Sequence, residues 1–394
     1  MENFEFESPT HFAFGRGAER RTGALVKAFS GTKALLHFGG GSIKANGVYD
    51  GVVASLEEAG VVYVPLGGVR PNPREDLVRQ GIELVRREKI DFVLAVGGGS
   101  VIDSAKAIAF GSLYDGDFRD FTFGKDCKKP PIVPAALPVG AVLTIAAAGS
   151  EASCNSIISL APDNLKRTIT GDRLRPRFAV MNPEFTFTLP PYQTACGLVD
   201  IFAHVAERYF TPTRGVLATD EMCEAVMRTI VAEGAAVMRD GSDYDARANI
   251  MWAGSIAHNN VCGVGRVQDW ASHGIEHELS ALYDCAHGAG LAVVMPAWME
   301  YVMSAGVERF ARFAEKVWGV VPGDAGAMAK EGLARYRAWL GSIGMPTTFA
   351  ELGARPEDIP LLAANLGLGE GQTLGAFRRL TTADVEAILR LCVR

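Results

Sequence analysis

The sequence lacks the features that would take the chain into a membrane or an oxidising compartment. No stretch approaches about 18 uninterrupted apolar residues, the length of a membrane-spanning helix. The N-terminus, MENFEFESPTHFAFG, has neither the basic start nor the apolar core of a secretory signal. The seven cysteines include no CxxC pair and are odd in number and widely spaced, at positions 127, 154, 196, 223, 262, 285 and 392. These absences predict a cytoplasmic protein with reduced thiols and no membrane partner.

Basic residues are outnumbered by acidic residues, 39 to 45. The formal net charge is −6, and no polybasic run interrupts that balance, which argues against nucleic acid as a partner. What is present is an ordinary globular composition, with 48% apolar and 21% charged residues. A chain of 394 residues is longer than one hydrophobic core usually organises, so two domains are expected.

The first half alternates short apolar runs with amphipathic helical patterns. Residues 4–17 alternate apolar and polar side chains around Pro9 and predict an edge hairpin. The other predicted strands cover 33–38, 61–66, 91–96, 132–138, 155–160, 166–171 and 177–183. This order predicts a Rossmann-like α/β domain, in which a parallel sheet carries helices on both faces.

Two of the predicted strands end in the same turn, Gly-Gly-Gly-Ser, at 39–42 and 97–100. A glycine-rich turn from strand to helix lets the backbone approach a phosphate, whose charge is met by the free N–H groups of the helix. Neither turn is a GxGxxG fingerprint or a P-loop. One such turn could be a purely structural tight connection, but two in one parallel sheet indicate a dinucleotide site.

The sequence Leu189-Pro190-Pro191 marks a boundary, after which the apolar period is helical throughout. The predicted domains are therefore 1–189, α/β, and 190–394, all-α. The predicted helices cover 191–210, 216–238, 243–260, 269–282, 287–304, 306–318, 324–343, 357–366 and 382–392.

The segment 263–287 holds three of the seven histidines, His273, His277 and His287. His273 and His277 are four apart, which puts both imidazoles on one helix face, roughly 6 Å apart at Cβ. On one unbroken helix His287 would lie about 21 Å beyond His273. We therefore place a turn at 283–285, so that His287 opens a new element and faces back. Isolated histidines are usually ordinary core or surface residues, but this grouping favours a metal or catalytic site.

A second pair stands on the first predicted helix of the all-α domain. Asp200 and His204 are four apart among apolar residues, where a carboxylate is costly unless it is paired or metal-bound. The alternative is a capping or salt-bridged aspartate beside an incidental histidine. Together with His273 and His287, the pair makes a set of one aspartate and three histidines, which suits one divalent zinc or iron ion.

Residues 273–277 also fit H-x-x-E-H, the signature of a class of zinc peptidases in which the glutamate is the base. That hypothesis leaves Asp200, His204, His287 and both glycine-rich turns without a role. At helical spacing Glu276 is rotated about 100° from His277 and about 60° from His273. We therefore expect Glu276 on the flank of the histidine face, where its replacement by alanine would be mild.

Taken together, the motifs resemble the iron-containing (group III) alcohol dehydrogenases, particularly the NADPH-dependent butanol dehydrogenase and aldehyde reductase branch. The resemblance covers nearly the whole chain. It rests on Pro9-Thr10 with FGRGA (14–18), GGGSxxDxxK (97–106), GSE (149–151), Asn182-Pro183 with TLPP (188–191), GxxDxxxH (197–204) and the histidines of 273–287. It implies the dehydroquinate synthase-like alcohol dehydrogenase fold, a Rossmann-like domain followed by an α-helical domain.

The resemblance also implies roles for individual residues. The metal ligands would be Asp200, His204, His273 and His287, while His277 would serve catalysis beside the nicotinamide without binding metal. The cofactor-binding residues would be Gly39, Gly40, Gly41, Ser42, Asn72, Gly97, Gly98, Gly99, Ser100, Asp103, Thr144 and Lys166. Two positions depart from the family, since Ala146 and Ala148 stand where a proline and a threonine are often found. Relatives that prefer NAD carry an aspartate at the position of Gly39, so NADP(H) is expected here.

The implied reaction is hydride transfer between NADP(H) and a small alcohol or aldehyde, assisted by one divalent ion, Fe²⁺ or Zn²⁺, in a homodimer. A lyase of the related dehydroquinate-synthase type is the main alternative. Such an enzyme would need basic residues to hold a polyanionic substrate, and none cluster at 197–204 or 265–290.

Overall fold

The computed structural model describes residues 1–122, 132–160 and 163–394. It divides into two compact units. The sheet unit comprises Glu7–Leu189 and Gly241–Ser255, and the helical unit comprises Met1–Phe6, Pro190–Asp240 and Ile256–Arg394. The predicted domain limits, 1–189 and 190–394, stay a prediction. Within the described ranges, no helix combines the length and the hydropathy needed to cross a bilayer.

The sheet unit is built on six strands in the order β1-β8-β5-β4-β2-β3, and every neighbouring pair is parallel. Their bounds are β1 His11–Phe14, β2 Lys33–Phe38, β3 Val62–Leu66, β4 Phe92–Gly97, β5 Val139–Leu143 and β8 Phe178–Met181. The inner strands read as continuous apolar runs because both of their faces are covered. The predicted parallel-sheet α/β fold is confirmed.

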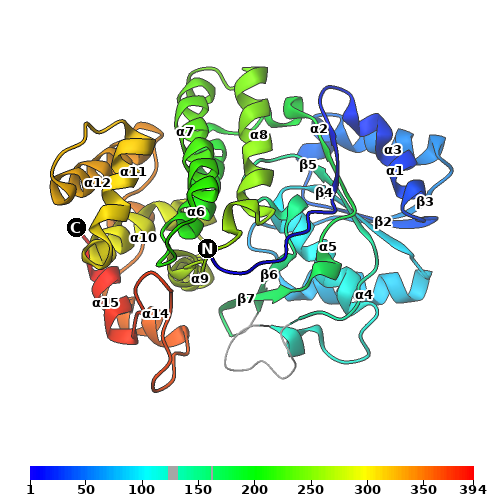
Figure 1. Cartoon of the computed structure of the whole chain (residues 1–394). Coiled ribbons are helices and arrows are strands. Elements are labelled where there is room, and N and C mark those ends of the chain that lie inside the picture. The colour runs from blue at the N-terminus through cyan, green and yellow to red at the C-terminus, as the bar shows by residue number, and fades with distance from the viewer. Residues whose placement is uncertain (123–131, 161–162) are drawn as a thin grey trace. The chain divides into compact units, whose positions relative to one another are not determined.

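Helices cover both faces of this sheet (Figure 1). Alternate residues of one strand therefore enter different cores, as β2 shows. Leu35 packs in the core formed with α4 and α5, and Leu36 packs in the core formed with α1 and α3. The helices are α1 Thr22–Ala28, α2 Ser42–Ala45, α3 Val48–Glu58, α4 Glu75–Glu88 and α5 Gly99–Gly111.

Two sequence predictions for the sheet were wrong. The segment 4–17 is not a hairpin, because β1 is a single edge strand whose partner is β8. The fourth strand lies at Val139–Leu143 and not at 132–138. Pro134 and Pro138 explain the second error, since proline lacks the N–H that a central strand must donate to its neighbour.

Three further elements complete the sheet unit. Strands β6 (Asn155–Leu160) and β7 (Leu165–Thr170) pair with each other as an antiparallel ribbon. Helix α8 (Tyr244–His258) contributes its residues up to Ser255 to this unit. There Trp252 packs edge-on against Phe12 of β1, with ring centroids 5.2 Å apart.

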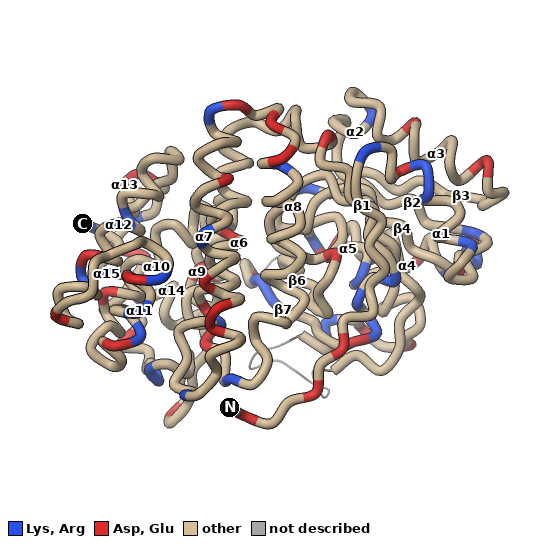
Figure 2. The backbone as a smooth tube through the Cα atoms, turned by 45° about the horizontal axis from the view of Figure 1, so that its top comes forward, with Lys and Arg blue, Asp and Glu red and all other residues tan. Residues whose placement is uncertain are grey.

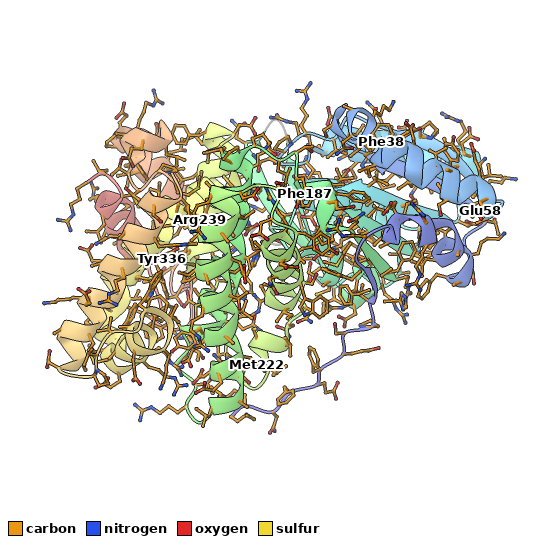
Figure 3. All side chains as sticks on the ribbon, turned by 90° about the horizontal axis from the view of Figure 1, so that it is seen from above. Phe38, Glu58, Phe187, Met222, Arg239 and Tyr336 are labelled. Carbon is orange, nitrogen blue, oxygen red and sulfur yellow. The ribbon has the colours of Figure 1, made fainter. Side chains whose placement is uncertain are left out.

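The central helix of the helical unit is α6 (Pro191–Tyr209). Its residues 197–209 are all buried. Phe202 of α6 stacks on Tyr336, labelled in Figure 3, with centroids 4.9 Å apart, and Trp339 packs beside both. The other helices are α7 Leu217–Arg239, α9 Ala271–Tyr283, α10 His287–Val302, α11 Val307–Trp318, α12 Ala325–Ser342, α13 Phe349–Leu352, α14 Ile359–Asn365 and α15 Thr382–Leu391. Apart from the short α13, each matches a predicted helix.

Charged residues of both signs are interspersed along the described helices (Figure 2). Helix α4 shows the usual order, with Glu75 and Asp76 in its first turn and Arg86 and Arg87 in its last. Acidic residues near the amino end and basic residues near the carboxyl end complement the helix dipole. The charge pattern of α4 therefore supports the helix itself and calls for no ligand.

His37 of β2 is a buried histidine with a structural role. Its side chain has no exposed surface, and its Nδ1 and Nε2 each lie 2.9 Å from a partner, the carbonyl oxygen of Leu66 and the hydroxyl of Ser104. Burial lowers the pKa of His37 to about 4, against the smaller opposing effect of the Leu66 carbonyl. The neutral ring satisfies both partners, because Nδ1–H donates to Leu66 and the Ser104 hydroxyl donates to Nε2.

This histidine is expected to make stability fall with acid. In the unfolded chain this histidine binds a proton below its ordinary pKa of about 6.5, whereas in the folded chain it stays neutral down to about pH 4. The free energy of unfolding should therefore fall by about 2 kcal/mol between pH 8 and pH 5. Urea unfolding at both pH values should show that the free energy of unfolding of His37→Gln changes by about 2 kcal/mol less than that of the wild type. His11→Gln, at an exposed histidine, is the control. Equal pH dependence in wild type and His37→Gln would contradict the assignment.

Candidate functional site

Helix α6 presents Asp200 and His204 together. Pro190 and Pro191 start the helix, where a missing N–H costs nothing, and the four-residue spacing then stacks the two side chains on one face. Asp200 is 3% exposed and His204 5% exposed. Nδ1 of His204 lies 3.2 Å from Oδ1 of Asp200, so the helix delivers a buried carboxylate–imidazole pair.

The other two predicted ligands arrive from α9 and α10, and the predicted turn between them is present. Helix α9 ends at Tyr283, Asp284 adopts the left-handed conformation with φ 51°, and α10 begins at His287. His273 and His287 consequently face the same aspartate. Their Nε2 atoms lie 3.9 Å and 3.7 Å from Oδ1 of Asp200.

A glycine in the first turn of α10 permits this approach. A Cβ at Gly288 would stand 2.1 Å from the carbonyl oxygen of Cys196 in α6, so any side chain there would clash with the backbone of α6. Helix α10 packs directly against both α6 and α9. Glycine at this position therefore brings His287 within reach of Asp200.

Three of the four predicted ligands form one tight group. Asp200, His204 and His273 each offer a ligand atom within 4.8 Å of the others. His287 approaches Asp200 but belongs to a second, adjoining group with Glu276 and His277. Ligand atoms bound at about 2.0–2.2 Å to one tetrahedral ion lie roughly 3.3 Å apart, so distances of 3.2–3.9 Å to Asp200 Oδ1 suit a shared cation.

The donor atoms of the tight group also lack other partners. Asp200 Oδ1, His204 Nδ1 and Nε2 of His273 are buried and make no hydrogen bond. Buried polar atoms without partners are costly and uncommon. A divalent ion would satisfy all of them, and one carboxylate with imidazoles is a donor set that suits zinc or iron.

The electrostatics of neighbouring imidazoles differ. Burial, and then the nearby histidines and Arg208, lower the pKa of His204 well below its usual value. For His273, burial acts in the same direction, but the carboxylates of Glu207 and Asp200 outweigh it and raise the pKa to about 9. The carboxylates of Glu207 and Asp200 therefore favour a positive charge at His273.

Sequence reasoning missed the contacts that three further residues make with the proposed ligands. Glu207, one turn beyond His204, contacts His273. His258, at the end of α8, lies with its ring centroid 4.1 Å from that of His204. Glu276 was expected on a flank with little effect. It is instead fully buried and contacts Nδ1 of His287 and the hydroxyl of Ser280, so we now expect Glu276→Ala to disturb the site.

The spacing of Asp200, His204 and Glu207 on one helix face could have revealed Glu207. Nothing in the sequence around His258 distinguishes it from an ordinary helix-end histidine. His277, the predicted catalytic residue, is half-buried, with its ring centroid 5.5 Å from His287 and 6.4 Å from His273. It lies outside the Asp200 group.

In the sheet unit, the two glycine-rich turns follow neighbouring strands. Gly39–Ser42 follows β2, and Gly97–Ser100 ends β4 and begins α5; β2 and β4 are paired in parallel. Their carboxyl ends therefore meet at one edge of the sheet, where ligands of such folds bind. Thr144, just beyond β5, joins them, since its backbone N–H donates to the Gly97 carbonyl at 3.1 Å.

Asp103, in the first turns of α5, is buried and already engaged. Its Oδ2 accepts the N–H of Ile157 at 3.0 Å, and its Oδ1 accepts the hydroxyl of Ser150. Lys106 holds the same segment by donating to the carbonyls of Ser150 at 2.7 Å and Asn155 at 2.7 Å, while burial lowers the pKa of Lys106 to about 8. The GGGSxxDxxK motif thus fastens α5 to the GSE segment, which follows Ala146 and Ala148.

Asn72 and Lys166, the remaining cofactor candidates, are both buried and belong to connected segments. Asn72 adopts the left-handed conformation with φ 53°, which asparagine tolerates better than most residues. The N–H of Ser159 donates to the Pro73 carbonyl at 2.8 Å, and Ser159 pairs with Lys166 across the β6–β7 ribbon. The loop after β3 and the ribbon are therefore joined.

Comparison with known proteins gives one consistent result. Residues 9–183 match the family described as iron-containing alcohol dehydrogenase, and residues 194–393 match the C-terminal region of the Fe-containing alcohol dehydrogenase family. NADH-dependent butanol dehydrogenase A of Clostridium acetobutylicum is 39% identical over 392 residues, covering 99% of both chains. NADPH-dependent aldehyde reductase YqhD of Escherichia coli is 34% identical, covering 97% of this chain and 100% of its own.

Solved structures agree with the sequences. The crystal structure of NADH-dependent butanol dehydrogenase A from Thermotoga maritima superposes with a TM-score of 0.96 at 40% identity, covering 100% of this chain and 99% of that one. These matches set aside both the peptidase and the lyase alternatives. They also confirm the predicted resemblance, fold and class of oxidoreductase. The chain belongs to the iron-containing alcohol dehydrogenase family.

Proposed function

We propose that this alcohol dehydrogenase interconverts small aldehydes and alcohols with NADP(H) and one divalent ion, held by Asp200, His204, His273 and His287. The observation that carries the proposal is the convergence of three imidazoles on Oδ1 of Asp200 at 3.2–3.9 Å. Several of these buried donor atoms lack any hydrogen-bond partner. When bound, such an ion supplies a Lewis acid that polarises a carbonyl oxygen.

His277 is proposed as the proton donor in aldehyde reduction. When bound, a reduced nicotinamide would supply the hydride for the carbonyl carbon. A ring N–H of His277 would donate the proton that the oxygen needs, so that the products are an alcohol and the oxidised cofactor. In alcohol oxidation the same nitrogen takes the proton back. Its half-buried position beside His273 and His287, outside the Asp200 group, supports this role.

The cofactor would occupy the edge of the sheet lined by the two glycine-rich turns. Gly97–Ser100 begins the 13-residue helix α5, whose free N–H groups favour a pyrophosphate. Gly39–Ser42 would face the adenosine ribose, with Asn72, Asp103, Thr144 and Lys166 as the other proposed contacts. The two named relatives differ, since one is NADH-dependent and the other NADPH-dependent. The preference between NADH and NADPH therefore depends on the residues of this chain that would contact the adenosine ribose.

Two features of the first turn support NADP(H). The turn carries no carboxylate, which in NAD-preferring folds binds the ribose 2′-hydroxyl and repels a 2′-phosphate. Lys44 follows it on α2, with its Nζ 5.2 Å from the ring of Phe38, labelled in Figure 3, and 5.0 Å from the ring of Tyr49. The two rings hold a cation beside the turn, where a 2′-phosphate would be neutralised.

Changing this turn is expected to reverse the preference. A Cβ at Gly39 would meet only ordinary contacts, 3.4 Å from the Val69 carbonyl oxygen, so Gly39→Asp should fold normally. We expect Gly39→Asp and Lys44→Gln each to raise the KM for NADPH about tenfold, about 1.4 kcal/mol, with little change for NADH. Lys27→Gln, at an exposed lysine of α1, is the control. A wild-type enzyme that prefers NADH at equal concentration would contradict the argument.

The whole proposal is tested by assaying the metal-loaded protein with NADPH and with NADH against a panel of short-chain aldehydes, alongside metal analysis. Reduction that depends on bound metal is the expected result, and iron or zinc content identifies the ion. Absence of reduction by the fully loaded protein would refute the function. We also propose a homodimer, from the resemblance alone, and a cytoplasmic location, which the free thiols of the six described cysteines support.

A further inference from the structure

Two carboxylates behind the proposed ligands are buried with no role in the mechanism above. Glu207 of α6 and Glu276 of α9 are both 0% exposed. A carboxylate without solvent costs several kcal/mol unless charges or hydrogen bonds compensate it. Each of these two lies against the Nδ1 atom of a different proposed ligand.

Glu207 holds His273 at two points. Its Oε1 accepts the backbone N–H of His273 at 3.1 Å, and its Oε2 lies 3.2 Å from Nδ1 of the same ring. Neither Oε2 nor this Nδ1 has another hydrogen-bond partner, so each atom is available to the other. The backbone reinforces the arrangement, because Asp269 N–H donates to the Glu207 carbonyl at 3.0 Å, four residues before His273.

Glu276 does the same for His287 from the opposite side of the turn. One carboxylate oxygen contacts Nδ1 of His287, and the other accepts the hydroxyl of Ser280. Space for this carboxylate is provided by Gly290, where a Cβ would stand 2.7 Å from Cγ and Oε1 of Glu276. The side chain is thus fixed by a hydroxyl on its own helix and by a gap in α10.

These contacts settle which ring nitrogen is available on each histidine. When a metal displaces the Nε2 proton, an imidazole that donates Nδ1–H to a carboxylate presents its lone pair on Nε2. In both residues Nε2 is the atom that faces Asp200, at 3.9 Å for His273 and 3.7 Å for His287. Carboxylates in this relation orient metal-binding histidines and increase their basicity.

We propose that Glu207 and Glu276 are a pair of positioning residues that set the affinity of the site for its divalent ion, each by holding one imidazole with Nε2 toward Asp200. The inference rests on the proposed metal site and adds two residues to it. It also reassigns Glu276, which under the peptidase hypothesis would have been a catalytic base. Here its carboxylate is committed to His287 and Ser280.

The chain offers a matched control for a merely structural role. Glu224 of α7 is likewise 0% exposed, but it accepts from the Tyr209 hydroxyl at 2.8 Å and from Arg312 at 2.6 Å. Its replacement by glutamine removes a buried carboxylate of the same unit without touching a proposed ligand. Stability should suffer, and metal affinity should not.

The test measures the dissociation constant of Co²⁺ by chelator competition, and the visible spectrum of bound Co²⁺, for the full-length protein. We expect Glu207→Ala and Glu276→Ala to weaken binding toward 100-fold, and the two glutamine variants about tenfold, because an acceptor remains while the charge is lost. Gly290→Ala, which displaces Glu276 without changing any polar group, should weaken binding similarly to Glu276→Gln. The spectrum should change in each, and Glu224→Gln should match wild type in both measurements.

If an alanine variant does not fold, the glutamine and Gly290→Ala variants decide. Unchanged affinity in both glutamine variants, or an equal loss in Glu224→Gln, would overturn the inference. The proposed function fails separately. Weakened Co²⁺ binding in these variants of a wild-type protein that reduces no aldehyde would refute the function and support the positioning role. An active wild type together with unchanged Co²⁺ affinity in the variants would support the function and refute the positioning role.

Discussion

Asp200→Ala is expected to lose most of the bound metal and most of the catalytic activity. Each of the three imidazoles has a ring nitrogen 3.2–3.9 Å from Oδ1 of this residue. Without the carboxylate, a 2+ ion would be left with neutral ligands in a buried site, where uncompensated charge is costly. We expect a loss of affinity of more than about 100-fold, and similar losses for His204→Ala, His273→Ala and His287→Ala.

Metal content per chain, measured on each purified variant by plasma spectrometry, checks this result together with the rate of aldehyde reduction. His11→Ala removes an exposed histidine of β1 and should keep both at the wild-type level. Full metal occupancy in two or more of the four ligand variants would contradict the assignment of these residues as metal ligands. Circular dichroism of each variant establishes that the fold is retained.

His277→Ala should behave differently, keeping its metal and its fold while turnover falls by roughly 10²–10⁴-fold, the usual contribution of a general acid. Asp200, His204 and His273 form a group that excludes His277. Loss of its imidazole should therefore leave the ion in place and remove only the proton donor. Metal analysis and steady-state kinetics across pH on the same preparation measure both consequences.

Two alternatives would give other results for His277. A residue that only packs against the nicotinamide would lose less activity when replaced and leave the pH profile unchanged. A fourth metal ligand would leave His277→Ala without metal, and that outcome would contradict the assignment. Loss of activity in Glu276→Ala would not identify Glu276 as a catalytic base, because Glu276 contacts His287 and its removal is expected to weaken metal binding.

Local pattern was enough to predict most of the sheet and nearly all of the helices. The apolar runs of β2 and β4, each ended by three glycines, are self-contained signals. Pairing over distance is not. The alternation of residues 4–17 predicted a hairpin, whereas β1 pairs with β8, which follows more than 160 residues later. A single sequence contains no local sign of that partner.

The same limit applies to the site. Spacing brought Asp200 beside His204 and predicted the turn that returns His287, since both follow from helix geometry. The contacts of Glu207 and Glu276 depend on how α6, α9 and α10 pack, and that packing depends on glycines such as Gly288 and Gly290. Helical angles alone placed Glu276 on a flank, because they take no account of the helix that covers it.

The most direct test of the metal site is anomalous diffraction from crystals of the iron-loaded protein, recorded on both sides of the iron absorption edge. We expect one strong peak per chain, within bonding distance of one atom each from Asp200, His204, His273 and His287, with His277 unbound. A peak held instead by Glu276, His277 and His287, with the Asp200 carboxylate disengaged, would contradict this expectation.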